Sequence, residues 1–196
     1  MRRRRVLGTL ALGLATGAAA ALAALAGPEP SFQKAVVGKP FQDFVLRDIA
    51  SGKNIALSSY KGRKIVVAVF MQNNCGTTWR YERKIGDLIR DYKSKDVELV
   101  AVHSSFTETD ADIKGQIDSR NLPIPILDDK KKQELRAYVG ATNTPTFLVI
   151  DKEGVLRYRG AFDSQPSAGS TAYVRPALDA ILDKRAVTIT QTRAFG

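Results

Sequence analysis

The stretch of sequence that decides the fold is Lys64-Ile-Val-Val-Ala-Val-Phe70-Met-Gln-Asn-Asn-Cys75-Gly-Thr-Thr-Trp-Arg-Tyr81. Its first half is a continuous apolar run, which predicts a central strand covered on both faces. A short polar loop leads to Cys75, which starts a helix predicted over residues 76–93. Unpaired backbone N–H groups and the positive end of the helix dipole stabilise a thiolate at such a position. Because the loop is polar, we interpret Cys75 as a reactive thiol; the alternative is a small, buried and inert side chain.

The segments around this stretch predict one α/β domain. Apolar periodicity marks the expected elements: a hairpin within 41–58, strands at 64–70, 98–103, 145–150 and 155–160, an extended segment at 123–127, and helices at 76–93, 110–120, 130–138 and 170–184. The early strand–helix–strand order requires parallel strands, whereas the last two strands form an antiparallel hairpin. Together they predict a mixed central sheet flanked by helices.

A proline precedes the strand at 145–150, in the sequence Thr144-Pro145-Thr146. Proline is tolerated at the first residue of a strand for structural reasons alone. The alternative is a cis peptide bond, which is uncommon and usually marks a constrained site. We predict the cis form and place Thr144 and Pro145 among the candidate site residues.

Five segments carry a resemblance to a known family: Val37-Gly-Lys-Pro-Phe-Gln-Asp-Phe-Val-Leu, Ser59-Tyr-Lys-Gly-Arg-Lys-Ile-Val-Val, Asn74-Cys75, Ala141-Thr-Asn-Thr-Pro-Thr-Phe-Leu-Val-Ile-Asp and Tyr158-Arg-Gly. In these segments the chain resembles the redoxin group of the thioredoxin superfamily, related to alkyl-hydroperoxide-reductase/thiol-specific-antioxidant proteins. The resemblance implies an α/β, thioredoxin-like three-layer sandwich with an added N-terminal β-hairpin, and a peptide-thiol or peroxide substrate. It also implies that the cis-proline lies against the cysteine, where the backbone before it can pair with a bound peptide.

Several positions depart from the patterns of that family. Thr78 stands where thioredoxin-type members carry their second cysteine, and Gly76 stands where similar members often carry proline. Gln72 and Ala68 replace the hydroxyl residue and the proline of the peroxiredoxin pattern Pro-x-x-x-Thr/Ser-x-x-Cys. The sequence therefore offers Cys75 no internal thiol partner and lacks a residue that positions peroxide.

Other candidate site residues support the thiol. Gly76 and Thr77 offer helix-terminal N–H groups. His103, the only histidine, ends the strand at 98–103, and the C-terminal edges of parallel strands gather functional sites. It either approaches Cys75 and stabilises the thiolate or forms local hydrogen bonds in a loop. One histidine and one cysteine do not make a metal site, for which about four ligands are typical, so we expect no metal and no cofactor.

The N-terminus predicts export. Met1-Arg-Arg-Arg-Arg5 precedes an uncharged run rich in Ala and Leu, and Ala24-Leu25-Ala26 fits a cleavage site. We predict a signal peptide over 1–26, a linker over 27–35, the redoxin domain over 36–185 and a C-terminal tail over 186–196. The alternative is an uncleaved membrane anchor formed by residues 6–26. Export to the periplasm or the cell exterior means an oxidising compartment, where an odd cysteine is inert or reacts with another molecule.

The charge distribution argues against nucleic acid as a partner. The net charge of +10 falls to +6 without the four arginines of the predicted signal peptide. The remaining basic residues are interspersed with acidic ones, which is typical of a solvated surface. We expect contact with a membrane only if the N-terminal segment stays uncleaved.

Three functions remain open at this stage. The first is a thiol-disulfide oxidoreductase in which Cys75 forms a mixed disulfide that an external thiol resolves. Its partners would be protein or small-molecule thiols and disulfides. The second is a one-cysteine thiol peroxidase, an antioxidant that cycles through sulfenic acid. The third is a redox-inactive thioredoxin-like binding module.

Overall fold

The computed structural model describes residues 34–195. The predicted signal peptide over 1–26 and most of the predicted linker lie outside these residues. No helix within the described part of the chain is long and apolar enough to cross a membrane.

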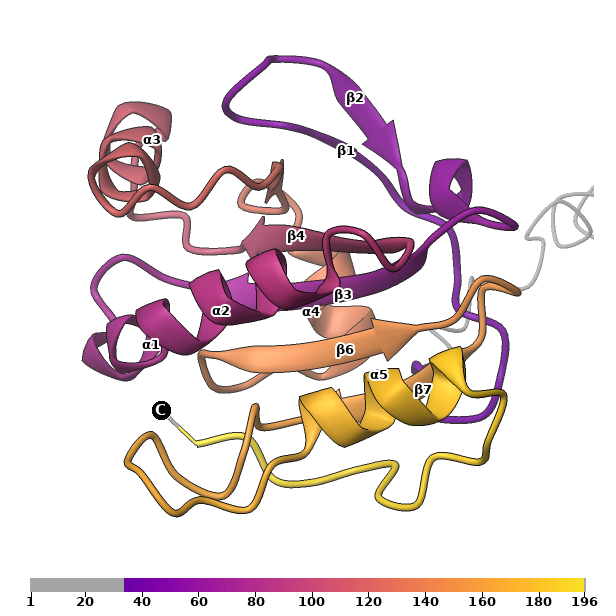
Figure 1. Cartoon of the computed structure of the whole chain (residues 1–196). Coiled ribbons are helices and arrows are strands. Elements are labelled where there is room, and N and C mark those ends of the chain that lie inside the picture. The colour runs from indigo at the N-terminus through magenta and orange to yellow at the C-terminus, as the bar shows by residue number, and fades with distance from the viewer. Residues whose placement is uncertain (1–33, 196) are drawn as a thin grey trace, which may run out of the picture. The chain divides into compact units, whose positions relative to one another are not determined.

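Strands and helices alternate along the chain (Figure 1). In order they are β1 (Val45–Arg47), β2 (Asn54–Ala56), the 3₁₀ helix η1 (Leu57–Tyr60), β3 (Ile65–Met71), α1 (Gly76–Arg80), α2 (Glu82–Tyr92), β4 (Val97–His103), α3 (Asp110–Ser119), β5 (Ile126–Asp128), α4 (Glu134–Val139), β6 (Thr146–Ile150), β7 (Leu156–Gly160) and α5 (Val174–Leu182). The predicted N-terminal hairpin is the antiparallel pair β1 and β2.

Strand β3 is the centre of a five-stranded sheet of order β5-β4-β3-β6-β7. It pairs parallel with β4 and antiparallel with β6. On the same two sides of β3, β4 and β5 are parallel, whereas β6 and β7 are antiparallel. All seven residues of β3 are buried. The predictions of a mixed sheet and of a doubly covered central strand are thus confirmed.

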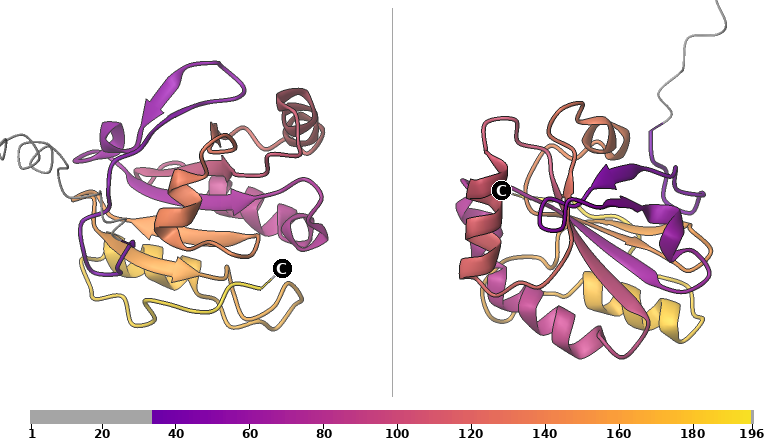
Figure 2. Two further views of the ribbon diagram at one scale, coloured as in Figure 1. Left: turned by 180° about the vertical axis from the view of Figure 1, so that it is seen from behind. Right: turned by 90° about the horizontal axis from the view of Figure 1, so that it is seen from above.

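Alternate side chains of β3 enter two cores, one on each face of the sheet. Val67 and Val69 join the core that α2, α3 and α5 cover, whereas Ala68 and Phe70 join the core that α4 covers. Figures 1 and 2 show α2 and α5 on one face of the sheet and α4 on the other. Because β3 and β4 are parallel, the segments that follow their C-terminal ends lie at one edge of the sheet.

The single helix predicted over 76–93 is wrong, because Tyr81 separates α1 from α2. The backbone at Tyr81 has φ −94° and ψ −4°. The buried hydroxyl of Tyr81 donates to Asp163 Oδ1 at 2.8 Å. The apolar period continues across the break, since Tyr81 and Ile85 enter the same core. Periodicity alone therefore does not reveal where the first helix ends.

The terminal helix is also shorter than the range 170–184 predicted for it. The residues before α5 are held instead by the loop after β7. The Ser170 hydroxyl donates to Asp163 Oδ2 at 3.0 Å, and the Tyr173 N–H donates to Phe162 O at 3.1 Å. These contacts keep the segment extended until Val174 starts the helix.

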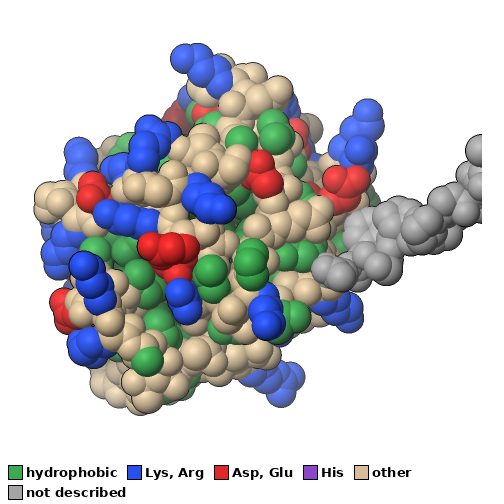
Figure 3. Space-filling view, turned by 90° about the vertical axis from the view of Figure 1, so that its right-hand side faces the viewer, with side chains coloured by type: hydrophobic (Ala, Val, Ile, Leu, Met, Phe, Trp, Pro, Cys, Tyr) green, Lys and Arg blue, Asp and Glu red, His purple; other side chains and the backbone are tan. Residues whose placement is uncertain are grey.

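Basic side chains are dispersed over the face of the protein that Figure 3 shows. On the face in Figure 3, Lys and Arg side chains stand apart, with acidic, apolar and uncharged groups between them. Several basic groups pair with carboxylates, as Arg47 does with Asp110 and Asp128 at 2.7 and 2.6 Å. This distribution is that of a solvated surface.

Candidate thiol site

Cys75 lies at the edge of the sheet where β3 ends. Residues 72–74 form the loop after β3, and Cys75 is the N-cap residue of α1, with extended φ and ψ of −91° and 104°. Its backbone N–H donates to Gln72 O at 3.2 Å. The thiol is half-buried. It therefore remains open to a reactant while its backbone is fixed.

The segment before β6 meets Cys75 from the other side. The Thr144–Pro145 peptide bond is cis, as predicted. The Cys75 thiol donates to the backbone carbonyl oxygen of Thr144 across 3.0 Å. Because β3 and β6 run antiparallel, with Phe70 opposite Thr146, the residue pair before β6 falls beside the loop after β3. The structure thus brings Cys75, Thr144 and Pro145 together.

The surroundings of Cys75 favour its ionised form. Burial raises the pKa of the thiol, but the side chains of Thr144 and Thr78 and the backbone N–H groups of Thr78 and Thr77 outweigh burial and lower that pKa below its ordinary value. The Thr78 hydroxyl is buried, and its oxygen has no hydrogen-bond partner within the described chain. Thr78 is thus one of the groups that lower the thiol pKa. Gly76 directly follows Cys75 as the first residue of α1.

A buried glutamate holds the loop before Cys75. Glu108, in the loop after β4, is 7% exposed. Its carboxylate accepts the backbone N–H of Asn73 at 3.3 Å and that of Asn74 at 3.1 Å. Sequence reasoning missed Glu108, because a single acid between two threonines in a polar segment is typical of an exposed loop.

His103 reaches the thiol loop only through this glutamate. His103 is 1% exposed and lies opposite Met71 in the register of β3 and β4. Its Nε2 lies 3.1 Å from Glu108 Oε2. Neither ring nitrogen has hydrogen-bond geometry to any partner in the described chain. Burial lowers the pKa of His103, only partly opposed by Glu108, and the imidazole is neutral at neutral pH.

Trp79 closes the other flank of the loop. Its indole N–H donates to Asn73 O at 2.6 Å. The Arg120 guanidinium covers the indole at 4.1 Å from the ring centroid and forms an ion pair with Glu82. The loop is therefore fixed from two sides, by a carboxylate on its N–H groups and by an indole on its carbonyl group.

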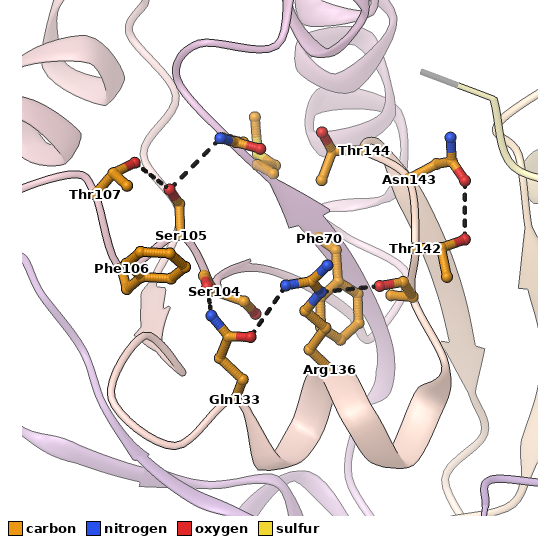
Figure 4. Close-up of a pocket in the computed structure, with 13 residues that line it drawn as sticks. Phe70, Ser104, Ser105, Phe106, Thr107, Gln133, Arg136, Thr142, Asn143 and Thr144 are labelled. Atoms are coloured by element: carbon orange, nitrogen blue, oxygen red, sulfur yellow. Dashed lines mark hydrogen bonds between the residues drawn. The ribbon is translucent and has the colours of Figure 1, made fainter.

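A pocket of about 280 Å³ opens beside the thiol loop. It lies between the segment after β4, helix α4 and the segment before β6 (Figure 4). Among the described residues that line it, Arg136 is the one charged side chain; these residues are Phe70, Met71, Gln72, Ser104, Ser105, Phe106, Thr107, Gln133, Arg136, Ala141, Thr142, Asn143 and Thr144. Within residues 34–195 no group of three or more His, Cys, Asp or Glu side chains is placed to hold a metal ion.

Comparisons with known proteins identify the family of the chain. The model of the AhpC/TSA family matches residues 37–159. The chain belongs to the AhpC/TSA family. A curated relative, the thioredoxin-like protein YneN of Bacillus subtilis (strain 168), is 26% identical over 125 residues, which are 61% of this chain and 68% of YneN.

Two solved structures extend the comparison to the fold of this AhpC/TSA family member. An uncharacterized conserved protein from Geobacillus kaustophilus is 28% identical, with a TM-score of 0.72 over 80% of this chain and 87% of that one. A hypothetical protein from Sinorhizobium meliloti 1021 is 27% identical, with a TM-score of 0.72 over 84% and 93%. The fold is thioredoxin-like, and the N-terminal hairpin is a small addition to it.

Proposed function

We propose that this protein is an exported thiol-disulfide oxidoreductase that uses Cys75 as its single nucleophile. The observation that carries the proposal is the position of the thiol, 3.0 Å from Thr144 O beside cis-Pro145. Hydrogen bonds that lower the thiol pKa support it, because the thiolate is the reacting form.

In the proposed reaction, the Cys75 thiolate attacks one sulfur of a substrate disulfide. A bond forms between Cys75 and that sulfur while the substrate S–S bond breaks, and the second sulfur leaves as a thiolate that takes up a proton. The chain holds one cysteine, so a thiol from another molecule must attack the mixed disulfide and release Cys75. Ionisation of Cys75 also frees the Thr144 carbonyl, which then accepts a hydrogen bond from an extended substrate in β fashion.

The test is to trap the mixed disulfide. The protein is treated with bis(2-hydroxyethyl) disulfide, and the adduct is followed by intact mass spectrometry. We expect one adduct that forms faster than on free cysteine at the same pH and is absent from Cys75→Ser. An unmodified wild-type protein, or a rate no faster than that of free cysteine, would refute the proposal.

The peroxidase alternative has less support. Gln72 stands where peroxiredoxins carry a hydroxyl residue, and its amide lies 3.5 Å from the Ser105 hydroxyl, on the side of the pocket. Stopped-flow mixing with hydrogen peroxide separates the two functions. We expect oxidation of Cys75 no faster than that of a free thiol, whereas a much faster reaction would favour the peroxidase.

The proposal that the protein is exported depends on the N-terminal sequence alone. It is therefore tested separately from the reactivity of Cys75. Cell fractionation followed by mass spectrometry of the protein should find a periplasmic or secreted form that begins at Gly27. A full-length protein in the membrane fraction would instead identify residues 6–26 as an anchor.

A further inference from the structure

We propose that the pocket beside Thr144 binds the carboxylate of a low-molecular-weight thiol or disulfide, and that this small molecule is the exchange partner of Cys75. The inference rests on the proposed function and names its substrate class. Three properties of the pocket carry it: a guanidinium with no ion pair in the described chain, a described lining without acids, and two lining residues, Gln72 and Thr144, that contact Cys75.

Arg136 brings a positive charge to the pocket, and no carboxylate of the described residues pairs with it. It projects from α4 beside Gln133 and towards the loop of Thr142 to Thr144 (Figure 4). Its Nε donates to Ala141 O at 3.1 Å and its Nη1 donates to Gln133 Oε1 at 3.0 Å. Both partners are neutral, and no ion pair involves Arg136 within residues 34–195. These two bonds orient the half-buried guanidinium and leave its charge for a ligand.

Asp129, whose carboxylate accepts the Arg136 backbone N–H, does not neutralise the Arg136 guanidinium. The Asp129 carboxylate accepts the Arg136 backbone N–H at 2.9 Å, the Leu135 N–H at 3.1 Å and the Ser104 hydroxyl at 2.8 Å. Asp129 is 3% exposed and does not line the pocket. Burial also raises its pKa above the ordinary value.

The remaining lining suits a small polar molecule. Hydroxyl and amide groups surround the guanidinium, and Phe106, whose side chain is 78% exposed, adds an apolar edge. A volume of about 280 Å³ lies at the lower end of small-molecule sites, which run from roughly 300 to 1,000 Å³. A guanidinium binds a carboxylate through two parallel N–H donors. The pocket therefore fits an amino-acid-like acid better than a folded protein surface.

Two lining residues connect the pocket to the thiol. Gln72 accepts the Cys75 backbone N–H, and Thr144 O accepts the Cys75 thiol. A ligand whose carboxylate lies at Arg136 can therefore direct its sulfur past Thr144 towards Cys75. The Cys75 thiolate attacks the ligand disulfide, the mixed disulfide forms, and the other half of the ligand leaves as a thiolate and is protonated. The same contacts hold a small thiol that resolves a mixed disulfide in the reverse direction.

The test compares disulfides that differ in charge. Rate constants for adduct formation on Cys75 are measured with oxidised glutathione, which carries carboxylates, and with neutral bis(2-hydroxyethyl) disulfide. Their ratio cancels changes in the intrinsic reactivity of the thiol. We expect Arg136→Gln to lower this ratio about tenfold, the scale of one lost hydrogen bond to a charged group. Lys131→Gln removes the same charge from an exposed residue outside the pocket and should leave the ratio unchanged.

A second measurement needs no variant. S-methylglutathione has the carboxylates but no free thiol, so it should protect wild-type Cys75 from iodoacetamide in a saturable manner, and its dimethyl ester should not. Equal ratios in the wild type and Arg136→Gln, or equal protection by acid and ester, would overturn the pocket assignment. Failure of Cys75 to react with either disulfide would instead overturn the proposed function.

Discussion

The buried Thr78 hydroxyl lies where it acts on the Cys75 thiol. It is 0% exposed and its oxygen has no hydrogen-bond partner in the described chain, although a buried hydroxyl without a partner is costly. Its compensation is the sulfur of Cys75, whose pKa it lowers. The hydroxyl therefore gains little from a neutral thiol, whereas a thiolate would accept a hydrogen bond from it.

Removal of that hydroxyl should make Cys75 less reactive. Thr78→Val keeps the shape of the side chain and removes the hydroxyl that would donate to the thiolate, and a hydrogen bond to a charged group is worth roughly 1.5–3 kcal/mol. We expect the pKa of Cys75 to rise and iodoacetamide alkylation at pH 7 to slow by about tenfold or more. The measurement is the pH dependence of alkylation, and Thr171→Val, at an exposed threonine far along the chain, is the matched control. An unchanged pH profile would show that the hydroxyl does not act on the sulfur.

Among the elements, the loop between β3 and α1 depends on a residue from the loop after β4. The Glu108 carboxylate accepts both the Asn73 and the Asn74 N–H groups. An amide side chain has one acceptor oxygen, so Glu108→Gln leaves one of the two N–H groups unpaired. We expect a loss of about 1–3 kcal/mol in the free energy of unfolding, measured by urea denaturation.

Hydrogen exchange locates this effect. The Asn73 and Asn74 amides should exchange faster in Glu108→Gln, whereas Glu153→Gln, at an exposed turn residue, should change neither exchange nor stability. Protection at both amides equal to that of the wild type would mean that Glu108 does not hold the loop.

The buried pair of His103 and Glu108 gives stability a defined dependence on pH. The pKa of His103 is lowered by burial in the folded protein, so the unfolded chain binds the proton first as the pH falls. Between the unfolded value of 6.5 and the lower folded pKa, the unfolded state holds more protons, and stability decreases with decreasing pH. We expect the free energy of unfolding to fall from pH 7 to pH 5, with a smaller fall in His103→Gln. Equal slopes for the two proteins would contradict this assignment.

Local sequence predicted those elements whose signals lie within one segment. The apolar run of 64–70 identified the central strand, and Thr144-Pro145 before a strand identified the cis bond. The partner of Asn73 and Asn74 was not predictable, because it depends on the register that places the loop after β4 beside the loop after β3. The break at Tyr81 was hidden for a similar reason, since its cause is a hydrogen bond to Asp163, far along the chain.

On the scale of the whole molecule, the C-terminal segment covers the exposed edge of the sheet. Arg159 on β7 pairs in parallel with Gln191, through N–H groups of Arg159 and Thr192 that donate to Thr190 O and Arg159 O, both at 3.1 Å. The Thr192 hydroxyl accepts the Ala161 N–H at 3.0 Å. Uncovered edge strands invite pairing with other chains, so this contact protects β7.

Gly160 makes that close approach feasible. Its φ is +151°, and a Cβ at this position would lie 2.6 Å from Thr192 O and 2.9 Å from Thr192 N, and against the Thr192 hydroxyl. Gly160→Ala must therefore push the C-terminal segment away from β7. We expect a loss of about 1–3 kcal/mol in the free energy of unfolding, the usual cost of overpacking, and faster tryptic cleavage after Arg193. The control Gly86→Ala has no atom within 4 Å of the added Cβ and should not destabilise, because alanine favours the helix.

Gly160→Ala destabilises through a clash with Thr192 and through backbone strain at positive φ. A shortened chain separates these two causes. In a chain that ends at Ala186 the C-terminal segment is absent, so the added Cβ meets no Thr192 and only the backbone strain at positive φ remains. The substitution should then cost much less than in the full chain, and the difference between the two costs measures the coupling of Gly160 to the segment. Equal costs in both chains would assign the whole effect to the backbone of Gly160 and leave the C-terminal segment without a role in protecting β7.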